Sequence, residues 1–272
     1  MQKPNERLTN QTSIVTGASS GIGTAVAKAL AREGSNVIIN YHNNKIGAEE
    51  VAHAITQDSK NAGVRIKQAD VSDEASVKEL FKFGKTEFGT IDICVSNSGI
   101  QKDAPLHDMT ISQWNQVIGV NLTGQFLCAR EALKEFMANG VQEKISSSAG
   151  KIIHMSSVHE VIPWSNHANY AAAKGGIVML MQSICQGYAK YKIRCNSIAP
   201  GATKTAINKD VWNNEQSYND LLRLIPYNRM AEPEDIGAVA SWLASDESEY
   251  INGTTIFVDG GMTCYPGFTT NG

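Results

Sequence analysis

Short apolar runs alternate with longer amphipathic stretches along the whole chain. The apolar runs are rich in Val and Ile, which is typical of strands buried on both faces of a sheet. They predict seven strands, at Thr12–Thr16, Asn36–Asn40, Val64–Gln68, Ile91–Val95, Lys151–Met155, Ile193–Ile198 and Thr255–Val258. The stretches between them have helical periodicity and predict helices at Gly21–Glu33, Asp73–Phe88, Ile111–Asn139, Asn169–Lys190 and Glu232–Ala244.

This alternation of strand and helix predicts the α/β fold class. A helix between two strands makes a crossover, so neighbouring strands are expected to run parallel. We therefore expect one doubly wound, Rossmann-type parallel sheet of about seven strands with helices on both faces. The chain contains no repeat, low-complexity tract or Pro-rich linker, and residues 1–272 are interpreted as a single domain.

Composition and charge narrow the classes of function. Of 272 residues, 42% are hydrophobic, which supports a substantial core. Lys and Arg number 24 against 27 Asp and Glu, giving a net charge of −3 without a basic block, so nucleic acid is not expected as a partner. No run approaches the roughly 18 apolar residues of a membrane span. Because residues 1–10 lack an apolar signal core, we expect a cytoplasmic protein.

The five cysteines show no spacing typical of a metal site. Their number is odd, and a reducing compartment disfavours disulfides. We interpret them as small, mostly buried apolar residues and expect no metal. They are Cys94, Cys128, Cys185, Cys195 and Cys264.

The first predicted strand runs into a glycine-rich turn that opens a helix. Such a turn presents free N–H groups and the positive end of the helix dipole to a pyrophosphate. Gly17 permits the tight turn, Gly21 lets the backbone approach the phosphates, and Gly23 lets the helix pack closely. The spacing G-x-x-x-G-x-G differs from the general G-x-G-x-x-G fingerprint, and an ordinary turn is the alternative. The residues predicted to bind a dinucleotide here are Gly17, Ser19, Ser20, Gly21, Ile22 and Gly23.

The ends of the second and third strands bear on cofactor choice. The second strand ends without the carboxylate that usually holds the adenosine ribose, and Tyr41 and His42 follow instead. The cofactor is therefore expected to be NAD or NADP. Asp70 and Val71 follow the third strand. Asp70 is predicted either to bind the adenine amino group, or to cap the next helix, or both.

A Ser, Tyr and Lys constellation indicates proton transfer. Ser157 ends the fifth strand, and Tyr170 and Lys174 lie four residues apart on one face of a predicted helix. A phenol has a pKa of about 10, and a nearby ammonium favours its ionised form. Ser157 is then expected to hold the substrate oxygen. An incidental Tyr–Lys pair on a helix is the alternative for that pair alone.

The same helix predicts an interface between subunits. Ile177, Met181 and Ile184 continue the Tyr170 face and are expected to cover the sheet. The opposite face carries Gly176 and Met179 rather than charges, which is typical of a helix buried on both sides. We expect a homo-oligomer with two-fold contacts, although another helix of the same chain is the alternative.

Together these motifs resemble the short-chain dehydrogenase/reductase family over nearly the whole chain. The resemblance implies that Tyr170 is the general acid/base, that Lys174 holds the nicotinamide ribose and lowers the pKa of Tyr170, and that Asn121 positions a water in a proton relay. It adds further cofactor-binding residues: Asn97, Gly99, Pro200, Gly201 and Thr203. The family's usual Asn-Asn-Ala-Gly reads Ser96-Asn97-Ser98-Gly99 here, and the retained small residues are expected to preserve close backbone approach.

Within the family, three stretches resemble the bacterial glucose 1-dehydrogenases: His154–Trp164, Gly201–Asn208 and Val258–Phe268. This likeness implies hydride transfer from the C1 hydroxyl of a sugar, β-D-glucose first, to NAD or NADP, with the lactone as product and a homotetramer as assembly. His159 and Glu160 are expected to contact sugar hydroxyls with Ser157 and Tyr170. An exposed charge pair is the alternative for these two.

Two other functions stay open. One is a short-chain enzyme acting on another alcohol or carbonyl, such as an oxoacyl thioester, a steroid or another polyol, with the segment 203–230 as the lid that decides the substrate. The other is a non-catalytic nicotinamide-binding regulatory protein. The complete Ser157, Tyr170, Lys174 and Asn121 set disfavours the latter, because a site without chemistry has no need of it.

Overall fold

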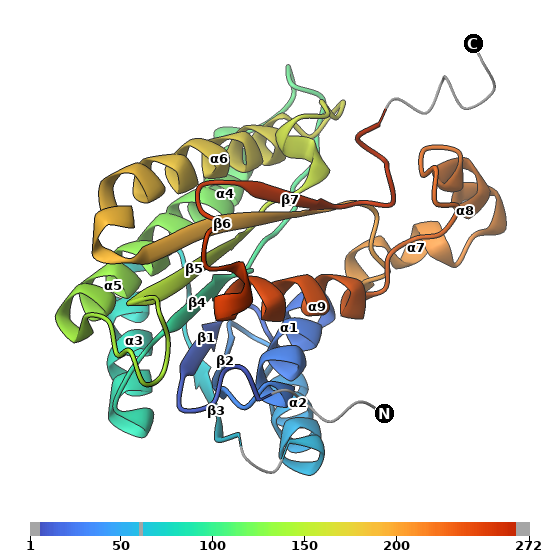
Figure 1. The fold of residues 1–272 in the computed structure, drawn as a ribbon. Helices are drawn as coiled ribbons and strands as arrows, with labels where there is room; N and C mark the ends of the chain where they lie inside the picture. The colour runs from blue at the N-terminus through green and yellow to red at the C-terminus, as the bar shows by residue number, and fades with distance from the viewer. Residues whose placement is uncertain (1–5, 60–61, 265–272) are drawn as a thin grey trace.

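The computed structural model describes residues 6–59 and 62–264, and one parallel sheet of seven strands lies at its centre (Figure 1). The strands are in the order β3-β2-β1-β4-β5-β6-β7. All seven predicted strands are confirmed, with ends shifted by at most two residues. Their bounds are β1 Thr12–Val15, β2 Asn36–Tyr41, β3 Val64–Gln68, β4 Ile93–Ser96, β5 Gly150–Met155, β6 Ile193–Pro200 and β7 Thr255–Val258.

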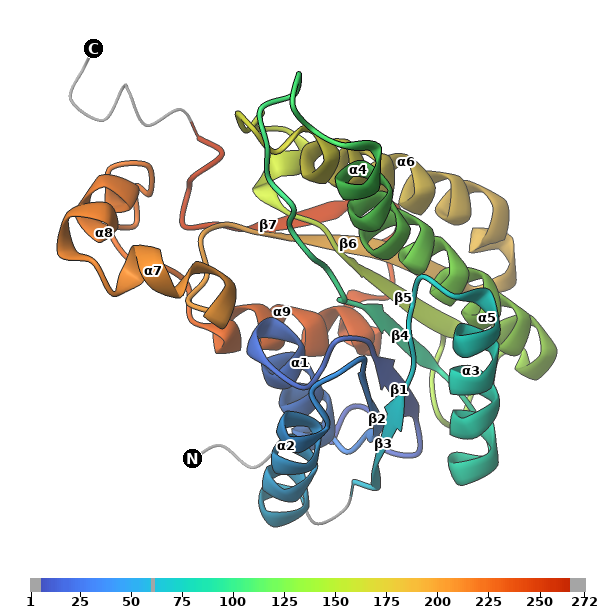
Figure 2. The same cartoon turned by 180° about the vertical axis from the view of Figure 1, so that it is seen from behind.

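Helices cover both faces of the sheet, as expected. One face carries α1, α2 and α9, and the other carries α3, α4, α5 and α6 (Figures 1 and 2). The short helices α7 and α8 project beyond the carboxyl ends of β6 and β7. The bounds are α1 Gly21–Arg32, α2 Lys45–Asp58, α3 Glu74–Phe88, α4 Ile111–Ile118, α5 Gly124–Asn139, α6 Ala168–Tyr188, α7 Lys209–Trp212, α8 Glu215–Leu222 and α9 Pro233–Ala244. Within the described residues, no helix combines the length and apolarity that crossing a membrane would need.

Alternation along the strands divides the core into two layers. Ile153 and Met155 of β5 face α1, α2 and α9, whereas Ile152 faces α3, α5 and α6. Successive side chains of a strand point to opposite faces, so both layers draw on every central strand. This explains why the runs in the sequence are apolar throughout rather than alternating.

The two helices α1 and α9 pack closely although they come from opposite ends of the chain. Gly237 of α9 lies so near that a Cβ atom on it would be 2.8 Å from the carbonyl oxygen of Ala25 in α1. Only a residue without a side chain permits this approach. The helix that begins at the glycine turn is therefore held in place by α9, the last α-helix in the described part of the chain.

The predicted helix Ile111–Asn139 differs from a regular α-helix. The residues Gly119–Thr123 form a π-helical turn between α4 and α5. One extra residue is accommodated there without ending the helix, which periodicity alone does not reveal.

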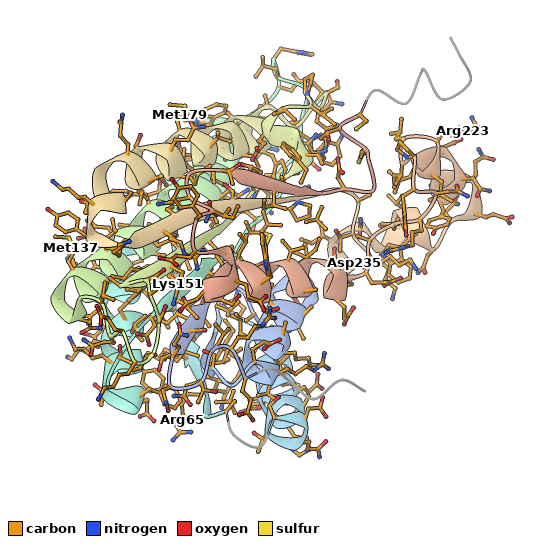
Figure 3. The ribbon with its side chains drawn as sticks, viewed as in Figure 1. Arg65, Met137, Lys151, Met179, Arg223 and Asp235 are labelled. Carbon is orange, nitrogen blue, oxygen red and sulfur yellow. The ribbon has the colours of Figure 1, made fainter. Side chains whose placement is uncertain are left out.

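The outer face of α6 is only partly as expected. Ile177, Met181 and Ile184 are buried against the sheet. Gly176, which was assigned to the outer face, packs on Leu122 of the same chain, because a Cβ atom on it would lie 2.9 Å from that side chain. Met179 is 62% exposed on the outer side of α6 (Figure 3). The subunit interface stays a prediction.

The cysteines were expected to be mostly buried. The five cysteines are free thiols; Cys94, Cys128 and Cys195 are buried, Cys185 is half-buried and Cys264 is exposed. The interpretation as mostly buried residues is thus confirmed for three of them.

The end of the Val258–Phe268 stretch, residues 265–268, lies outside the described residues.

Two buried cations lie where β5 and β6 begin, at the opposite end of the sheet from the glycine turn. Arg194 is 4% exposed and makes five hydrogen bonds, to backbone oxygens of Leu243, Ser245 and Ser248 and to the hydroxyls of Ser248 and Ser148. Lys151 is 1% exposed, and its Nζ donates to Gln11 Oε1 (2.7 Å) and Ser146 Oγ (2.6 Å). Burial lowers the pKa of Lys151 to about 8.

Candidate active site

The glycine turn lies at the carboxyl ends of β1 and β4, where the strand order reverses. A crevice at this point is the usual ligand site of an open α/β sheet. Gly17 and Gly21 have φ angles of 61° and 56°, a region that favours glycine. At Gly23 a Cβ atom would lie 2.4 Å from the carbonyl oxygen of Gly17. Gly17 and Gly23 therefore have the reasons predicted for them, and the approach of phosphates to Gly21 stays a prediction.

The start of α1 offers groups that fit a pyrophosphate. Ser20 is the N-cap, yet its side chain makes no capping hydrogen bond, so the first-turn N–H groups stay available to an anion. Thr205 lies over the turn, 3.3 Å from the position of a Cβ atom on Gly21. A hollow of about 450 Å³ between α1 and the segment after β6 adjoins this point and is lined by Lys204 and Lys209 among others.

Two asparagines hold the turn in shape. Asn97 Nδ2 donates to the carbonyl oxygens of Thr16 (2.9 Å) and Gly17 (3.2 Å). Asn40 Oδ1 accepts from Gly17 N–H (3.2 Å), and its Nδ2 donates to Ala69 O (3.1 Å). The side chain of Asn97, predicted to bind cofactor, is thus engaged with the turn. The bracing role of Asn40 was not predicted, although an amide in an otherwise apolar strand was a signal for it.

The neighbouring loop confirms the expected need for small residues. A Cβ atom on Gly17 would be 3.0 Å from both Cα and Oγ of Ser98. A larger residue at position 98 would press on the turn. Gly99 lies next to Asn121, because a Cβ atom on Gly99 would be 3.6 Å from Asn121 Oδ1.

At the ends of β2 and β3, the predicted adenosine site has an acidic and a basic side chain. Tyr41 is buried and Val71 is 6% exposed, whereas His42 is exposed, with Nε2 3.7 Å from Asp70 Oδ2. Burial acts to raise the pKa of Asp70, but hydrogen bonds from Ser72 hold it below its usual value.

Asp70 does not cap α3. The N-cap is Asp73, whose Oδ2 accepts from Ser76 N–H (2.7 Å). Asp70 Oδ1 instead accepts from the N–H (2.9 Å) and the hydroxyl (2.7 Å) of Ser72. The capping alternative was therefore wrong, because two aspartates three residues apart compete for one helix start and the second one has it.

The predicted proton-transfer residues come together at the carboxyl end of β5. Lys174 Nζ lies 5.4 Å from the centroid of the Tyr170 ring. The Ser157 hydroxyl stabilises the ionised form of Tyr170, and it also accepts from His159 N–H (3.2 Å). Asn169 fixes the start of α6, since its Oδ1 accepts from Tyr170 N–H (2.7 Å) and its Nδ2 donates to Lys102 O (2.9 Å).

The ammonium group of Lys174 is buried away from water. The side chain is buried, and Nζ donates to Met155 O (2.7 Å). Burial lowers the pKa of Lys174 to about 8, and the charge of Glu160 opposes this. Burial raises the pKa of Tyr170, against the stabilising Ser157 hydroxyl. That Lys174 lowers the pKa of Tyr170 during the reaction stays a prediction.

Asn121 occupies the π-helical turn and is fully buried. Its Oδ1 accepts from Ile100 N–H (2.8 Å), and its Nδ2 donates to Ile100 O (2.9 Å). The side chain thus ties the loop after β4 to the helix. π-Helical turns are frequent at functional sites. That Asn121 positions a water stays a prediction.

A stack of three rings borders the site. Trp164 lies between His159 (centroids 4.3 Å apart) and His167 (3.5 Å), and His159 and Trp164 meet Tyr170 edge-on at 6.3 Å. His159 Nδ1 is 3.0 Å from Ile162 O, and burial lowers the pKa of His159. His167 Nε2 lies 3.1 Å from Asp103 Oδ2. This stack was not predicted, because the loop between His159 and His167 brings its rings together and no periodic pattern marks such a loop.

The predicted residues after β6 lie beside the crevice. Pro200 ends β6, and Thr203 Oγ1 donates to Gly201 O (3.1 Å). A Cβ atom on Gly201 would be 2.8 Å from Cα of Asp259. Backbone therefore approaches backbone here, as at the glycine turn. The predicted residues that follow β1, β4, β5 and β6 therefore lie at the same end of the sheet, where the carboxyl ends of these strands meet.

Comparisons with known proteins extend over almost the whole chain. A family model described as enoyl-(acyl carrier protein) reductase matches residues 17–263. The chain is 43% identical to 3beta-hydroxysteroid dehydrogenase 1 of Eggerthella lenta, over 96% of this chain and 97% of that protein. It is 41% identical to glucose 1-dehydrogenase 2 of Bacillus subtilis, over 95% and 97%.

A solved structure is also similar. The gluconate 5-dehydrogenase of Burkholderia cenocepacia, in complex with NADP and tartrate, superposes with a TM-score of 0.85 at 32% identity and covers 97% of this chain and 99% of that one.

Proposed function

This chain belongs to the short-chain dehydrogenase/reductase family, and on that premise we propose that it oxidises the C1 hydroxyl of a sugar, β-D-glucose first, to the lactone with NAD or NADP. The observation that carries the proposal is the meeting of Ser157, Tyr170 and Lys174 beside the glycine turn. An alcohol held there has a base and a hydrogen-bond partner within reach. The predicted residues 1–272 act as one dinucleotide-binding catalytic domain.

The chain's own groups fit the cofactor. The uncapped N-terminus of α1 would hold the pyrophosphate, because its N–H groups have no side-chain partner. His42 and Asp70 would hold the adenosine, and the exposed His42 would tolerate either a ribose hydroxyl or a 2′-phosphate. The residues after β6 would hold the nicotinamide. When bound, NAD or NADP supplies the nicotinamide ring that accepts hydride.

The proton of the substrate hydroxyl goes to Tyr170. Its phenolate must form near neutral pH, although burial raises its pKa in the protein alone. Lys174 has the charge to favour that phenolate, because its Nζ lies 5.4 Å from the centroid of the Tyr170 ring. Ser157 orients the substrate oxygen and stabilises the same phenolate. Asn121 completes the set as the residue proposed to hold a water for proton release.

Two lines support a sugar as substrate. The B. subtilis relative is named for glucose, and the B. cenocepacia structure for gluconate. The segment after Ser157 brings the polar side chain of His159 to the ring of Tyr170, and buried sugar hydroxyls need such partners. A cytoplasmic location and a homotetramer belong to the same proposal.

A second candidate is a hydroxysteroid. The E. lenta relative, named for a 3beta-hydroxysteroid, is 43% identical over a similar length. Both candidates use the same proton transfer and differ in the pocket under the segment 203–230, where α7 and α8 lie.

A panel of substrates decides between them. Formation of NADH or NADPH is followed by absorbance with glucose, other aldoses, gluconate and a 3β-hydroxysteroid, and kcat/KM is compared. A value for glucose at least tenfold above the other substrates supports the proposal. Turnover of the steroid without turnover of any sugar replaces it with the second candidate, and no turnover with any substrate refutes both.

Replacing Tyr170 tests the proton transfer. Tyr170→Phe is expected to bind cofactor normally and to lose at least about 100-fold in kcat, the scale of general acid/base catalysis. Tyr188→Phe, on the same helix but away from the site, is the matched control and should retain wild-type kcat. A Tyr170→Phe variant with unchanged kcat would show the mechanism to be wrong.

A further inference from the structure

A row of polar side chains crosses the sheet below the site. In the register of four neighbouring strands, Ser96 is paired with His154, His154 with Ser197, and Ser197 with Thr255. Paired residues on parallel strands point to the same face. That face is the one covered by α5 and α6, where two residues earlier β4, β5 and β6 carry the apolar core side chains of Cys94, Ile152 and Cys195.

Three atoms in this row are buried without a hydrogen-bond partner: His154 Nε2, Ser197 Oγ and Thr255 Oγ1. The imidazole of His154 donates from Nδ1 to Gln125 Oε1 (2.7 Å), because Gln125 uses its amide N–H to bond Met155 O (3.1 Å). Nε2 therefore has a free lone pair. His154 is uncharged, since burial lowers its pKa to about 3. Such orphaned groups in a native core call for an explanation.

A carboxylate lies at the end of the row. Glu160 is on the 3-10 turn Val158–Glu160, directly after Ser157, and its Oε2 is also buried without a hydrogen-bond partner. Burial raises the pKa of Glu160, and the hydroxyls of Ser156 and Thr255 oppose this by stabilising its charged form, although neither reaches Oε2 with hydrogen-bond geometry. Ser156 Oγ in turn contacts Lys174 O at 3.5 Å. The carboxylate is thus directed inward, between the polar row and the lysine of the site.

We propose that Glu160 is a positioning residue of this active site: it supplies the buried counter-charge that keeps Lys174 an ammonium. The inference rests on the proposed function, because it takes Lys174 to hold the cofactor. The polar row supports the carboxylate with hydroxyls rather than with cations, so its charge is free to act on Lys174.

The charges around Lys174 make this role specific. In the part of the chain that the structure describes, the titratable groups that interact with Lys174 or face it are Glu160 from the 3-10 turn, His154 from β5 and Tyr170 from its own helix. His154 is neutral and Tyr170 is neutral until it gives up its proton. Glu160 is therefore the one source of negative charge among them, and it opposes the desolvation of Lys174.

The test is the pH dependence of reduced-cofactor binding, measured by NADH and NADPH fluorescence from pH 6 to 10. Binding is expected to weaken as Lys174 loses its proton, with a midpoint near pH 8 in the wild type. Glu160→Gln is expected to move that midpoint down by about one pH unit, as loss of a nearby opposite charge does. At pH 8 it should bind about fivefold more weakly than the wild type, with little change at pH 6.

Two further variants serve as an independent test and as a control. Thr255→Val removes a hydroxyl that stabilises the carboxylate and should move the midpoint in the same direction by less. Glu79→Gln changes an exposed carboxylate on α3 and should leave it unmoved. Circular dichroism confirms that each variant is folded, and Thr255→Val alone decides if Glu160→Gln does not fold.

The outcomes separate this inference from the proposed function. If the wild type binds neither cofactor at any pH, the proposed function fails and the inference fails with it. If the wild type binds and the midpoint is the same in Glu160→Gln, or in Thr255→Val where that variant decides, the inference alone is overturned. A weaker affinity by an equal factor at every pH also overturns it, because that result indicates a structural role.

Discussion

Replacing Gly23 by Ala tests how the glycine turn is built. Gly23 lies in the first turn of α1, and a Cβ atom there would be 2.4 Å from Gly17 O, 2.6 Å from Asn97 Nδ2 and 2.9 Å from Ala18 Cα. Two of these three atoms are backbone, so rotation of a flexible side chain relieves little of the overlap. The turn must instead move away from α1 by about 1 Å to restore ordinary contact.

The cost follows from two contributions. Overpacking of this kind costs about 1–3 kcal/mol. The same movement strains the Asn97 hydrogen bonds to Thr16 O and Gly17 O, and each such bond contributes about 0.5–1.5 kcal/mol. We expect Gly23→Ala to lower the free energy of unfolding by about 2–4 kcal/mol. Because the displaced turn is also the proposed pyrophosphate site, cofactor affinity should fall at least tenfold, which is about 1.4 kcal/mol.

Urea unfolding and NADPH fluorescence titration measure the two effects. Gly187→Ala is the matched control, because nothing lies within 4 Å of a Cβ atom at that exposed helical position. It should leave affinity unchanged and stability equal or slightly higher, as alanine is favoured over glycine in a helix. A Gly23→Ala protein with wild-type stability and affinity within twofold would refute the steric reasoning.

Two further predictions concern the buried cations at the other end of the sheet. Arg194→Met leaves several buried acceptors unpaired and should lower the free energy of unfolding, measured in urea, by about 3–5 kcal/mol. The control is Arg32→Met, at a side chain that is 56% exposed beside Asp58, and it should change that free energy by less than about 0.5 kcal/mol. A loss under about 1 kcal/mol for Arg194→Met would contradict the stabilising role given to the Arg194 hydrogen bonds. Lys151 has a pKa of about 8 when folded against an ordinary 10.5, so between these values its contribution to stability rises with pH, by up to about 3 kcal/mol. Other groups titrate in the same window, since burial lowers the pKa of Lys174 to about 8 and raises the pKa of the thiols of Cys94, Cys128 and Cys195. The contribution of Lys151 is therefore taken as the stability of the wild type minus that of Lys151→Met, which should rise by up to about 3 kcal/mol between pH 8 and 10.5; a difference that does not change with pH would show that Lys151 does not contribute.

The sequence predicted the sheet well because a strand buried on both faces appears as an uninterrupted apolar run. A strand such as β5 must be apolar on two sides, and its apolar run is visible without knowledge of its neighbours. The spacing of Tyr170 and Lys174 was equally informative, because residues four apart on a helix share a face whatever the helix packs against.

Features that depend on contacts between distant segments were harder to predict. The π-helical turn at Asn121 is tied to Ile100 in another loop, and periodicity within the helix does not reveal that partner. Asp70 and Asp73 are both good caps by residue type, and the chain direction after β3 decides between them. Glu160 was interpreted as a substrate contact at the mouth of the site. Its inward Oε2 depends on β7, which lies almost 100 residues later in the chain.

The packing of α9 on α1 has a consequence for biosynthesis. The glycine turn leaves the ribosome early, but the helix that clamps α1 through Gly237 is translated roughly 200 residues later, a delay of about 10 to 40 seconds at ordinary elongation rates. During that interval the side of α1 that packs on α9 is exposed, although β1, β2 and α2 are already available to cover the rest. Nascent chains and fragments that stop before Pro233 should therefore be clients of chaperones, and the nucleotide crevice should mature only after translation is nearly finished.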